Sequence, residues 1–333
     1  MSIESIDYNQ AQQFYNQGME QYQNIAYGEE NAKELLLMGF VARGAVLLSG
    51  APGGAKSLLS RNAHRIFTDI SDEEIAIVPP SAQLQDAQLV GDLMSFDKEI
   101  TGADGTPTTE ATRIEVKGIV KPDSKVIWVD EASRVNPTAL NALLGAPEER
   151  KLKTTAGEIP LNSLQILMST MNPSERREAT SKMSAAFASR HNGGAIMGGT
   201  PTEVDGAKLL QGQMPDPYSV QPFVSTKELD QIREALKHVM LPEAEVKLAA
   251  RLVEAAKTEL YDEHQIKEEN RMYVQLGKNA KILGMFKGRT ANAEDVHQAL
   301  NYVMASRIGA LVSGKDTSLV LSAAVQNVLN RAA

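Results

Sequence analysis

The stretch that decides the fold is AVLLSGAPGGAKS, residues 45–57. Its first five residues form a short apolar run, which is typical of a buried strand. Glycines and a proline follow, and from Lys56 to Phe67 the apolar side chains can share one buried face, which predicts a helix. The order of strand, glycine-rich loop and helix predicts the first unit of a parallel α/β sheet.

The loop in this stretch has the composition of a phosphate cradle. The pattern G-x-x-x-x-G-K-[ST] is matched, with alanine in place of the second glycine, by Gly50, Ala51, Pro52, Gly53, Gly54, Ala55, Lys56 and Ser57. Glycines allow backbone amides to turn toward phosphate oxygens. Lys56 can neutralise the β- and γ-phosphates, and the Ser57 hydroxyl can coordinate magnesium. A glycine-rich turn followed by a chance Lys-Ser is the alternative interpretation.

Two carboxylates follow a later apolar strand. The run Lys125 to Val129 precedes Asp130 and Glu131. At such a position we expect Asp130 to hold Mg²⁺ and Glu131 to orient and activate the attacking water. The alternative interpretation of Asp130 and Glu131 is a solvated strand end or a helix cap. Because both motifs occur in the required order on the required elements, the sequence predicts binding of ATP with Mg²⁺.

The remaining pattern predicts further elements and a domain division. Strands are expected at 74–78 and 164–170, an inserted β-hairpin at 93–120, and a helix from Asn136-Pro137 to about residue 149. A Gly- and Pro-rich stretch after residue 193 predicts a linker. We expect an α/β domain over 1–200 with an N-terminal segment over 1–24, a linker over 201–224, and a helical domain over 225–333.

Composition excludes several classes of site. The formal charge is −8, so no global basic field attracts nucleic acid, and nucleic acid is not an expected partner. There are no cysteines, and the five histidines lack ligand spacing, so Cys- or His-based metal sites are not expected. The first residues do not resemble a signal peptide, and no apolar run is long enough to span a bilayer. A cytoplasmic location is the expectation.

These motifs resemble the AAA+ ATPases, and within them the MoxR family, over nearly the whole chain. MoxR-like proteins commonly carry alanine before the loop lysine, as at Ala55. The segment from Asp130 to Arg134, followed by Asn136-Pro137 and by Ala142 to Leu144, is similar to the family pattern D-E-x-x-R-x-x-P-x-x-x-x-A-L-L. The resemblance implies an α/β fold of the AAA+ kind: an α/β/α sandwich with a central parallel sheet and a β-hairpin insertion, followed by a small all-helical lid domain.

The resemblance also implies roles for individual residues. Asn172, in the segment Ser169 to Pro173, aligns with the sensor that contacts the γ-phosphate or the attacking water. Arg190 aligns with the arginine finger, with Arg176 and Arg177 as alternatives for that role. Arg271 aligns with a second sensor, a cation that the lid brings to the phosphates.

Tyr27 and Gly28 resemble the segment that flanks the adenine in AAA+ proteins. The family further implies a homo-oligomeric ring, most commonly a hexamer, and a chaperone-like activator often paired with a protein that bears a von Willebrand factor A domain. The sequence leaves open a nucleic-acid motor or loader, a chelatase-type subunit, and a nucleotide-binding scaffold without turnover.

Overall fold

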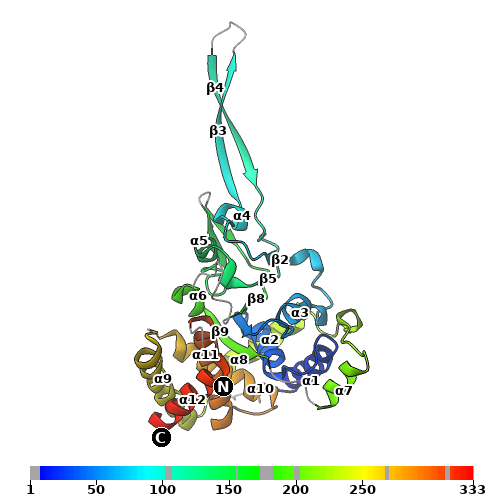
Figure 1. Ribbon diagram of the computed structural model, residues 1–333, viewed down its shortest axis with the longest axis vertical. Helices are drawn as coiled ribbons and strands as arrows, with labels where there is room; N and C mark the ends of the chain where they lie inside the picture. Colours follow the sequence, from blue (N-terminus) through cyan, green and yellow to red (C-terminus); the bar gives the residue numbers. More distant parts are fainter. Residues whose placement is uncertain are drawn as a thin grey trace, which may run out of the picture.

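The structure is a computed structural model that describes residues 8–101, 107–154, 157–172, 183–198, 203–266, 270–311 and 316–332. Its centre is a parallel sheet in the strand order β2-β5-β8-β1-β9 (Figure 1). The strands are β1 (Ala45–Gly50), β2 (Ile75–Val78), β5 (Val126–Val129), β8 (Ile166–Met171) and β9 (His191–Met197). The predicted fold class is confirmed, and the first four of these strands lie where their apolar runs predict them.

The edge strand β9 was missed, because its glycines have the composition of a loop. A Cβ on Gly194 would lie 2.6 Å from the backbone nitrogen of Ser306, and one on Gly193 would lie 2.9 Å from Leu35 Cδ1. Both positions are therefore confined to glycine by helices that pack directly on the strand. The glycine pair serves close helix packing and does not mark a linker.

Strand residues alternate between two apolar cores, one on each face of the sheet. Val46 and Leu48 belong to one core, and Ala45 and Leu47 to the other. The first core contains residues of α1 (Asn9–Gln23), α2 (Glu30–Ala42), α3 (Lys56–Asn62) and the C-terminal helices. The second contains residues of α4 (Asp86–Val90), α5 (Pro137–Ala142), α6 (Ala185–Ala188) and the strand β6 (Lys151–Thr154), which pairs with β7 (Gly157–Pro160).

Two helices are shorter than predicted. The helix expected from Asn136 to about residue 149 ends at Ala142 and continues as turns that lead into β6. Its start is as predicted, since the Asn136 side chain accepts from the Thr138 amide and Pro137 occupies the first turn. After Asn62, α3 passes into a 3-10 turn, Ala63–Ile66. Further 3-10 turns span Asp72–Glu74, Ala132–Arg134 and Pro217–Ser219.

The expected insertion is a long antiparallel hairpin of β3 (Asp92–Thr101) and β4 (Pro107–Val116). In Figure 1 it rises well beyond the body of the molecule, above α4 and α5. Its backbone pairing is continuous from Asp92 opposite Val116 to Thr101 opposite Pro107. The hairpin interrupts the chain between β2 and β5 without disturbing their pairing in the sheet.

The C-terminal part is helical, as predicted. Its helices are α8 (Thr226–His238), α9 (Glu243–His264), α10 (Arg271–Phe286), α11 (Ala293–Leu311) and α12 (Thr317–Ala332). A capping box at Ser225 and Glu228 starts α8. The expected linker contains the helix α7 (Glu203–Leu210). The helical region shares one core with α1, α2 and the sheet, so the domain boundary stays a prediction.

Candidate active site

The glycine loop joins the carboxyl end of β1 to α3. A Cβ on Gly50 would lie 2.1 Å from the carbonyl oxygen of Met197 on β9, so the loop can leave the sheet only through glycine. Gly53 has φ 84°, and Ala55 holds φ 57° in the left-handed region. The Lys56 ammonium lies over the loop and donates to Ala51 O at 2.6 Å. The loop thus has the closed curvature of a phosphate cradle, with the lysine at its mouth.

Asp130 lies beside the loop, at the carboxyl end of β5. The Ser57 hydroxyl donates to Asp130 Oδ1 at 3.0 Å, and the Thr170 hydroxyl donates to the same oxygen at 2.9 Å. Thr170 Oγ1 in turn accepts from the Glu131 amide at 2.9 Å. The sequence assigned no role to Thr170, although it lies two positions before Asn172 on the same strand end. The Thr170 hydroxyl therefore contacts both acidic residues, Asp130 through its carboxylate and Glu131 through its backbone amide.

Glu131 and Asn172 form the next part of the site. Asn172 Nδ2 donates to Glu131 Oε1 at 2.9 Å, and Arg134 Nε lies 2.9 Å from Glu131 Oε2. Asn172 is only 8 % exposed, and its Oδ1 is buried without a hydrogen-bond partner in the part of the chain that the structure describes. Glu131 adopts φ 44°, an unusual conformation for a glutamate. A polar acceptor left unpaired beside a carboxylate points to a group that the protein itself does not supply.

The segment expected to flank the adenine lies on the same side of the sheet. Gly28 has φ 65°, and the following Glu29 accepts through Oε1 from the Gly198 amide at 2.9 Å, at the carboxyl end of β9. Lys208 of α7 lies over the Tyr27 ring, 4.9 Å from its centroid. The structure therefore places Tyr27 and Gly28 at the edge of the sheet that carries the loop.

Arg190 lies at the opposite edge of the sheet. It immediately precedes β9, whose first residue pairs with Ala45 and whose last pairs with Gly50. Since β9 has seven residues, Arg190 is about 20 Å from the level of the glycine loop. Its Nη1 donates to Ala186 O at 2.9 Å, and its buried Nε has no hydrogen-bond partner. The side chain cannot reach the phosphate loop of its own chain.

Arg271 also lies at the amino edge, because α10 crosses the starts of β1 and β9. Lys278 and Asn279 of this helix donate to Ala42 O and Asn192 O. Arg271 itself forms a bidentate pair with Glu148, with Nε–Oε1 2.7 Å and Nη2–Oε2 3.1 Å. Arg271 therefore lies away from the phosphate loop of its own chain in this structure, and its role as the second sensor stays a prediction. Arg176 and Arg177 lie outside the described residues.

Comparisons with known proteins agree with this geometry. Residues 45–191 match the AAA domain of the dynein-related subfamily. The chaperone MoxR1 of Mycobacterium tuberculosis is 25% identical over 299 residues, which cover 88% of this chain and 67% of MoxR1. The chain therefore contains an AAA domain and is similar to the chaperone MoxR1 along most of its length.

Two other similarities support narrower conclusions. The structural protein ORF618 of Acidianus two-tailed virus is 23% identical over 147 residues, which is 44% of this chain and only 22% of the viral protein. A solved structure from Cytophaga hutchinsonii, of a protein proposed to be an ATPase, superimposes with a TM-score of 0.70 over 96% of both chains at 20% identity. This last similarity shows that the two chains share a fold.

The site at the carboxyl edge of the sheet offers oxygen atoms of the kind that Mg²⁺ prefers. Ser57 and Asp130 offer oxygen ligands, as Mg²⁺ prefers. Among the described residues, no group of three or more His, Cys, Asp and Glu side chains could hold a metal ion by itself. A site of this kind binds Mg²⁺ through one or two carboxylates together with substrate phosphates. The unpaired Asn172 Oδ1 fits the same interpretation.

The backbone around Arg190 is fixed by residues that the sequence analysis did not single out. Arg307 of α11 is fully buried and donates to His191 O at 3.0 Å and to Ser189 O at 3.3 Å. Gln275 of α10 donates to Ser189 O at 2.9 Å and accepts from Arg307 at 2.6 Å. The helical region thus holds the carbonyls on both sides of Arg190. A lone arginine in a helical pattern gave no signal of this.

None of the helices in the described ranges combines the length and apolar character that crossing a bilayer requires.

Proposed function

We propose that the chain binds ATP with Mg²⁺ at the carboxyl edge of its sheet and hydrolyses it. The observation that carries this proposal is the continuous hydrogen-bonded set formed by Ser57, Asp130, Thr170, Glu131 and Asn172, which gathers hydroxyl, carboxylate and amide groups beside the glycine loop. The AAA domain match over residues 45–191 supports the same activity at the level of the family.

The chemistry of the side chains gives each a role. Lys56 binds the β- and γ-phosphates as a point charge, and the loop amides orient them. Ser57 and Asp130 hold Mg²⁺, which neutralises phosphate charge when it is bound. Glu131 accepts the proton of the attacking water, and Asn172 orients that water through its amide. Arg134 keeps the Glu131 carboxylate in position through its ion pair.

The same proposal requires more than one copy of the chain. Arg190 and Arg271 are at the amino edge, and the phosphate loop is at the carboxyl edge. A ring in which the amino edge of one subunit faces the carboxyl edge of the next would place both arginines at a neighbour's γ-phosphate. There they stabilise the charge on the transferring phosphoryl group. A heterologous contact of this kind gives a ring when its rotation closes, and a closed hexamer is the assembly we propose.

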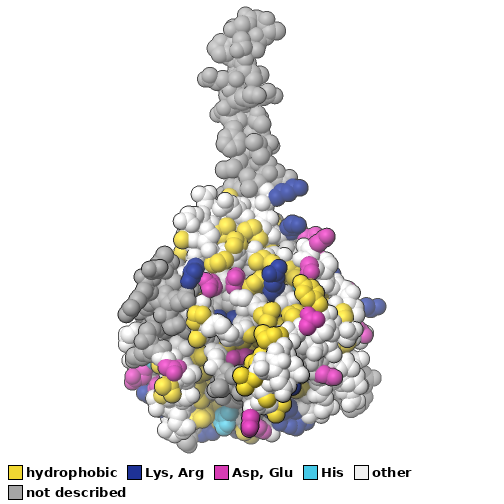
Figure 2. All heavy atoms as spheres, turned by 45° about the vertical axis from the view of Figure 1, so that its right-hand side comes forward, with side chains coloured by type: hydrophobic (Ala, Val, Ile, Leu, Met, Phe, Trp, Pro, Cys, Tyr) yellow, Lys and Arg dark blue, Asp and Glu magenta, His cyan; other side chains and the backbone are white. Residues whose placement is uncertain are grey.

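Turnover in such a ring would remodel partner proteins, in the manner that the name of the chaperone MoxR1 states for that relative. We propose a partner that bears a von Willebrand factor A domain, and the β3–β4 hairpin as the part that meets partner or client. On the face seen in Figure 2, Lys and Arg side chains are scattered among acidic and apolar ones. This mixed surface, with a net charge of −8, does not favour a nucleic-acid track.

The decisive experiment is the Glu131→Gln variant, measured for nucleotide binding and for phosphate release. We expect ATP affinity to remain and the hydrolysis rate to fall by about 10²- to 10⁴-fold, since a general base contributes that much. Glu158→Gln is the matched control, because Glu158 pairs with Lys151 on the β6–β7 hairpin. Normal hydrolysis by Glu131→Gln would disprove the assignment. Pull-down with the ATP-loaded variant then identifies the partner.

A further inference from the structure

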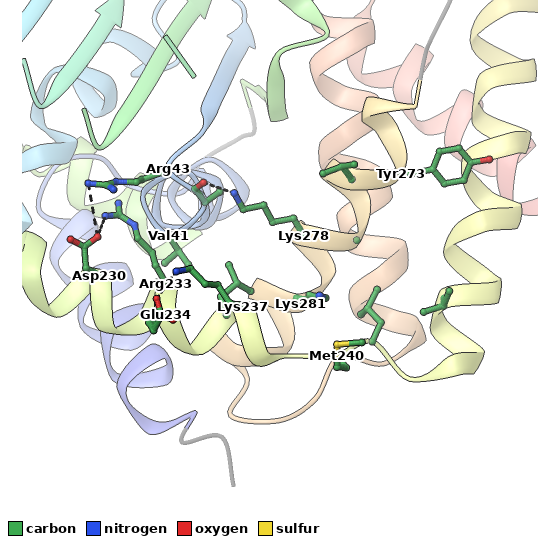
Figure 3. A pocket seen from close by; sticks show the side chains of 16 residues that line it. Val41, Arg43, Asp230, Arg233, Glu234, Lys237, Met240, Tyr273, Lys278 and Lys281 are labelled. Carbon is green, nitrogen blue, oxygen red and sulfur yellow. Dashed lines mark hydrogen bonds and ion pairs between the residues drawn. The ribbon is translucent and has the colours of Figure 1, made fainter. Parts of the chain in front are cut away.

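A cavity of about 900 Å³ opens at the amino edge of the sheet, between the end of α2, α8 and α10 (Figure 3). Its volume is in the range of small-molecule sites. One end is apolar, with Met240, Val246 and Val274 among its walls. The rest is rich in charge: its cations are Arg43, Arg233, Lys237, Lys278 and Lys281, and its carboxylates are Asp230 and Glu234.

The charges at the deep end do not balance. Arg43 and Arg233 both converge on Asp230, with nitrogen to oxygen distances of 4.0 Å and 2.6 Å (Figure 3). Lys278 points toward the end of α2, where it donates to Ala42 O, and Arg150 lies close enough to interact electrostatically with both arginines. Glu234 is engaged by Lys237 at 2.5 Å. Among the residues that the structure describes here, the four cations Arg43, Arg233, Lys278 and Arg150 therefore lie near one carboxylate, Asp230, that Lys237 does not engage.

Capping of α2 explains only part of this cluster. Arg233 Nη2 donates to Phe40 O at 2.6 Å and Lys278 Nζ to Ala42 O at 2.5 Å, so both cations bond the last carbonyls of the helix. The negative end of a helix dipole amounts to about half an elementary charge. Asp230 and this dipole together leave more than two positive charges without a counter-charge.

Donor atoms in the cluster are also left over. Arg233 is 10 % exposed, and its Nε is buried without a hydrogen-bond partner among the described residues, as are Arg43 Nε and Arg150 Nη1. Burial, together with the neighbouring Arg233 and Arg150, lowers the pKa of Lys278. Buried polar atoms in folded proteins are normally paired, and buried charges are compensated. Among the described residues, the cluster therefore has more cations than carboxylates, and three of its donor nitrogens lack an acceptor.

We propose that this cavity binds a small anion carrying two or more phosphate charges, such as pyrophosphate or a phosphate ester, at a site separate from the glycine loop. A single carboxylate would remove one positive charge and leave the rest, whereas a phosphate group removes two or more and matches the forked geometry of arginine. The apolar end provides space for an organic part of the ligand. The anion bonds Arg43, Arg233 and Lys278.

The test is calorimetric titration of inorganic pyrophosphate into Lys56→Ala protein at low ionic strength, so that the glycine loop does not contribute. We expect one site, weakened at least tenfold by Lys278→Met, which removes the charge and keeps the length of the side chain. Lys247→Met is the matched control, because Lys247 lies on α9 and pairs with the exposed Glu243. Absence of binding, or equal binding by the Lys278 and Lys247 variants, would overturn the proposal.

Further measurements keep the result decisive. If Lys278→Met does not fold, Lys281→Met removes a second lining cation and should weaken binding several-fold. Citrate, a polycarboxylate, is expected to bind at least tenfold more weakly than pyrophosphate, and equal binding would contradict selectivity for phosphate. A short single-stranded DNA that bound more tightly than pyrophosphate would show that the cavity reads a nucleic-acid backbone and would overturn the small-anion assignment.

Discussion

The two edges of the central sheet differ in chemistry and in how their side chains are held. At the carboxyl edge, the carboxylates Asp130 and Glu131 are held by the neutral side chains of Thr170 and Asn172. At the amino edge, the cations Arg190 and Arg271 are held by a backbone carbonyl and by Glu148. One edge offers water activation and metal ligands, and the other offers positive charge.

Under the proposed function, a single chain carries the two halves of a phosphoryl-transfer site at opposite edges of its sheet. The parallel register of β1 and β9 fixes their separation, since the residue after Arg190 pairs with the start of β1 and the loop begins at its end. Because packed strands do not slide past one another, no motion within the folded sheet can join the halves. Assembly is the remaining route.

The largest effect is expected for Arg190→Ala. Removing a finger arginine should lower the hydrolysis rate by about 10³-fold or more while ATP affinity is kept. Lys56→Ala should abolish nucleotide binding. Mixing the two inactive variants tests the comparison directly. In a mixed assembly, the intact glycine loop of an Arg190→Ala subunit can face the intact Arg190 of a Lys56→Ala subunit. Phosphate release should reappear in the mixture, and a mixture as inactive as its components would refute completion between subunits.

A smaller effect is expected for Gly194→Ala, which tests the rigid attachment of the helices to the amino edge. The new Cβ would lie 2.6 Å from the Ser306 backbone and force β9 away from α11. Overpacking of this kind costs about 1 to 3 kcal/mol of unfolding free energy, measured by urea denaturation. Gly206→Ala is the control, since nothing lies within 4 Å of that position on α7, and it should not destabilise the protein.

The third prediction concerns pH and His191, which is buried behind Arg190. Burial lowers the pKa of His191 to about 4, so the folded protein keeps the imidazole neutral where the unfolded chain, with a pKa near 6.5, takes up a proton. Stability should therefore fall as pH drops from about 6.5 toward 4, by about 2 kcal/mol at pH 5. His191→Gln should show a flatter pH dependence, and an unchanged slope would contradict a buried neutral histidine.

The smallest effect is expected at the carboxyl edge, for Ala55→Gly. Ala55 holds φ 57°, a conformation that costs a residue with a Cβ about 1 to 2 kcal/mol and glycine nothing. The gain is partly offset by the greater freedom of glycine in the unfolded chain. A net stabilisation of about 1 kcal/mol or less, with ATP affinity retained, is the expected result. Loss of affinity would show that the alanine itself shapes the cradle.

Much of this arrangement could be predicted from local sequence. Apolar runs located β1, β2, β5 and β8, because each strand is a short continuous stretch bounded by polar residues. The glycine loop and Asp130 follow from spacing alone. The proximity of Ser57 to Asp130 then results from the adjacency of strand ends in a parallel sheet. The roles of Glu131, Asn172, Arg190 and Arg271 stay predictions.

What could not be predicted depends on contacts between distant segments. Strand β9 reads as a loop because Gly193 and Gly194 are explained by helices more than 100 residues away in the chain, α2 at Leu35 and α11 at Ser306. Arg307 reads as a solvated helical arginine until its partners at Ser189 and His191 are known. The position of Arg271 depends on Glu148, 123 residues away. A local sequence pattern carries no information about contacts between residues so far apart in the chain.

The close contact of α11 with β9 has a mechanical consequence. Arg307 bonds the carbonyls on both sides of Arg190, and Gly194 leaves no space between α11 and β9. We therefore expect α11 and β9 to move together at this edge. A rotation of α11 would then move Arg190 together with the helix. In the proposed ring, a nucleotide-driven movement of these helices in one subunit would change the position of Arg190 relative to the phosphates bound by the next subunit.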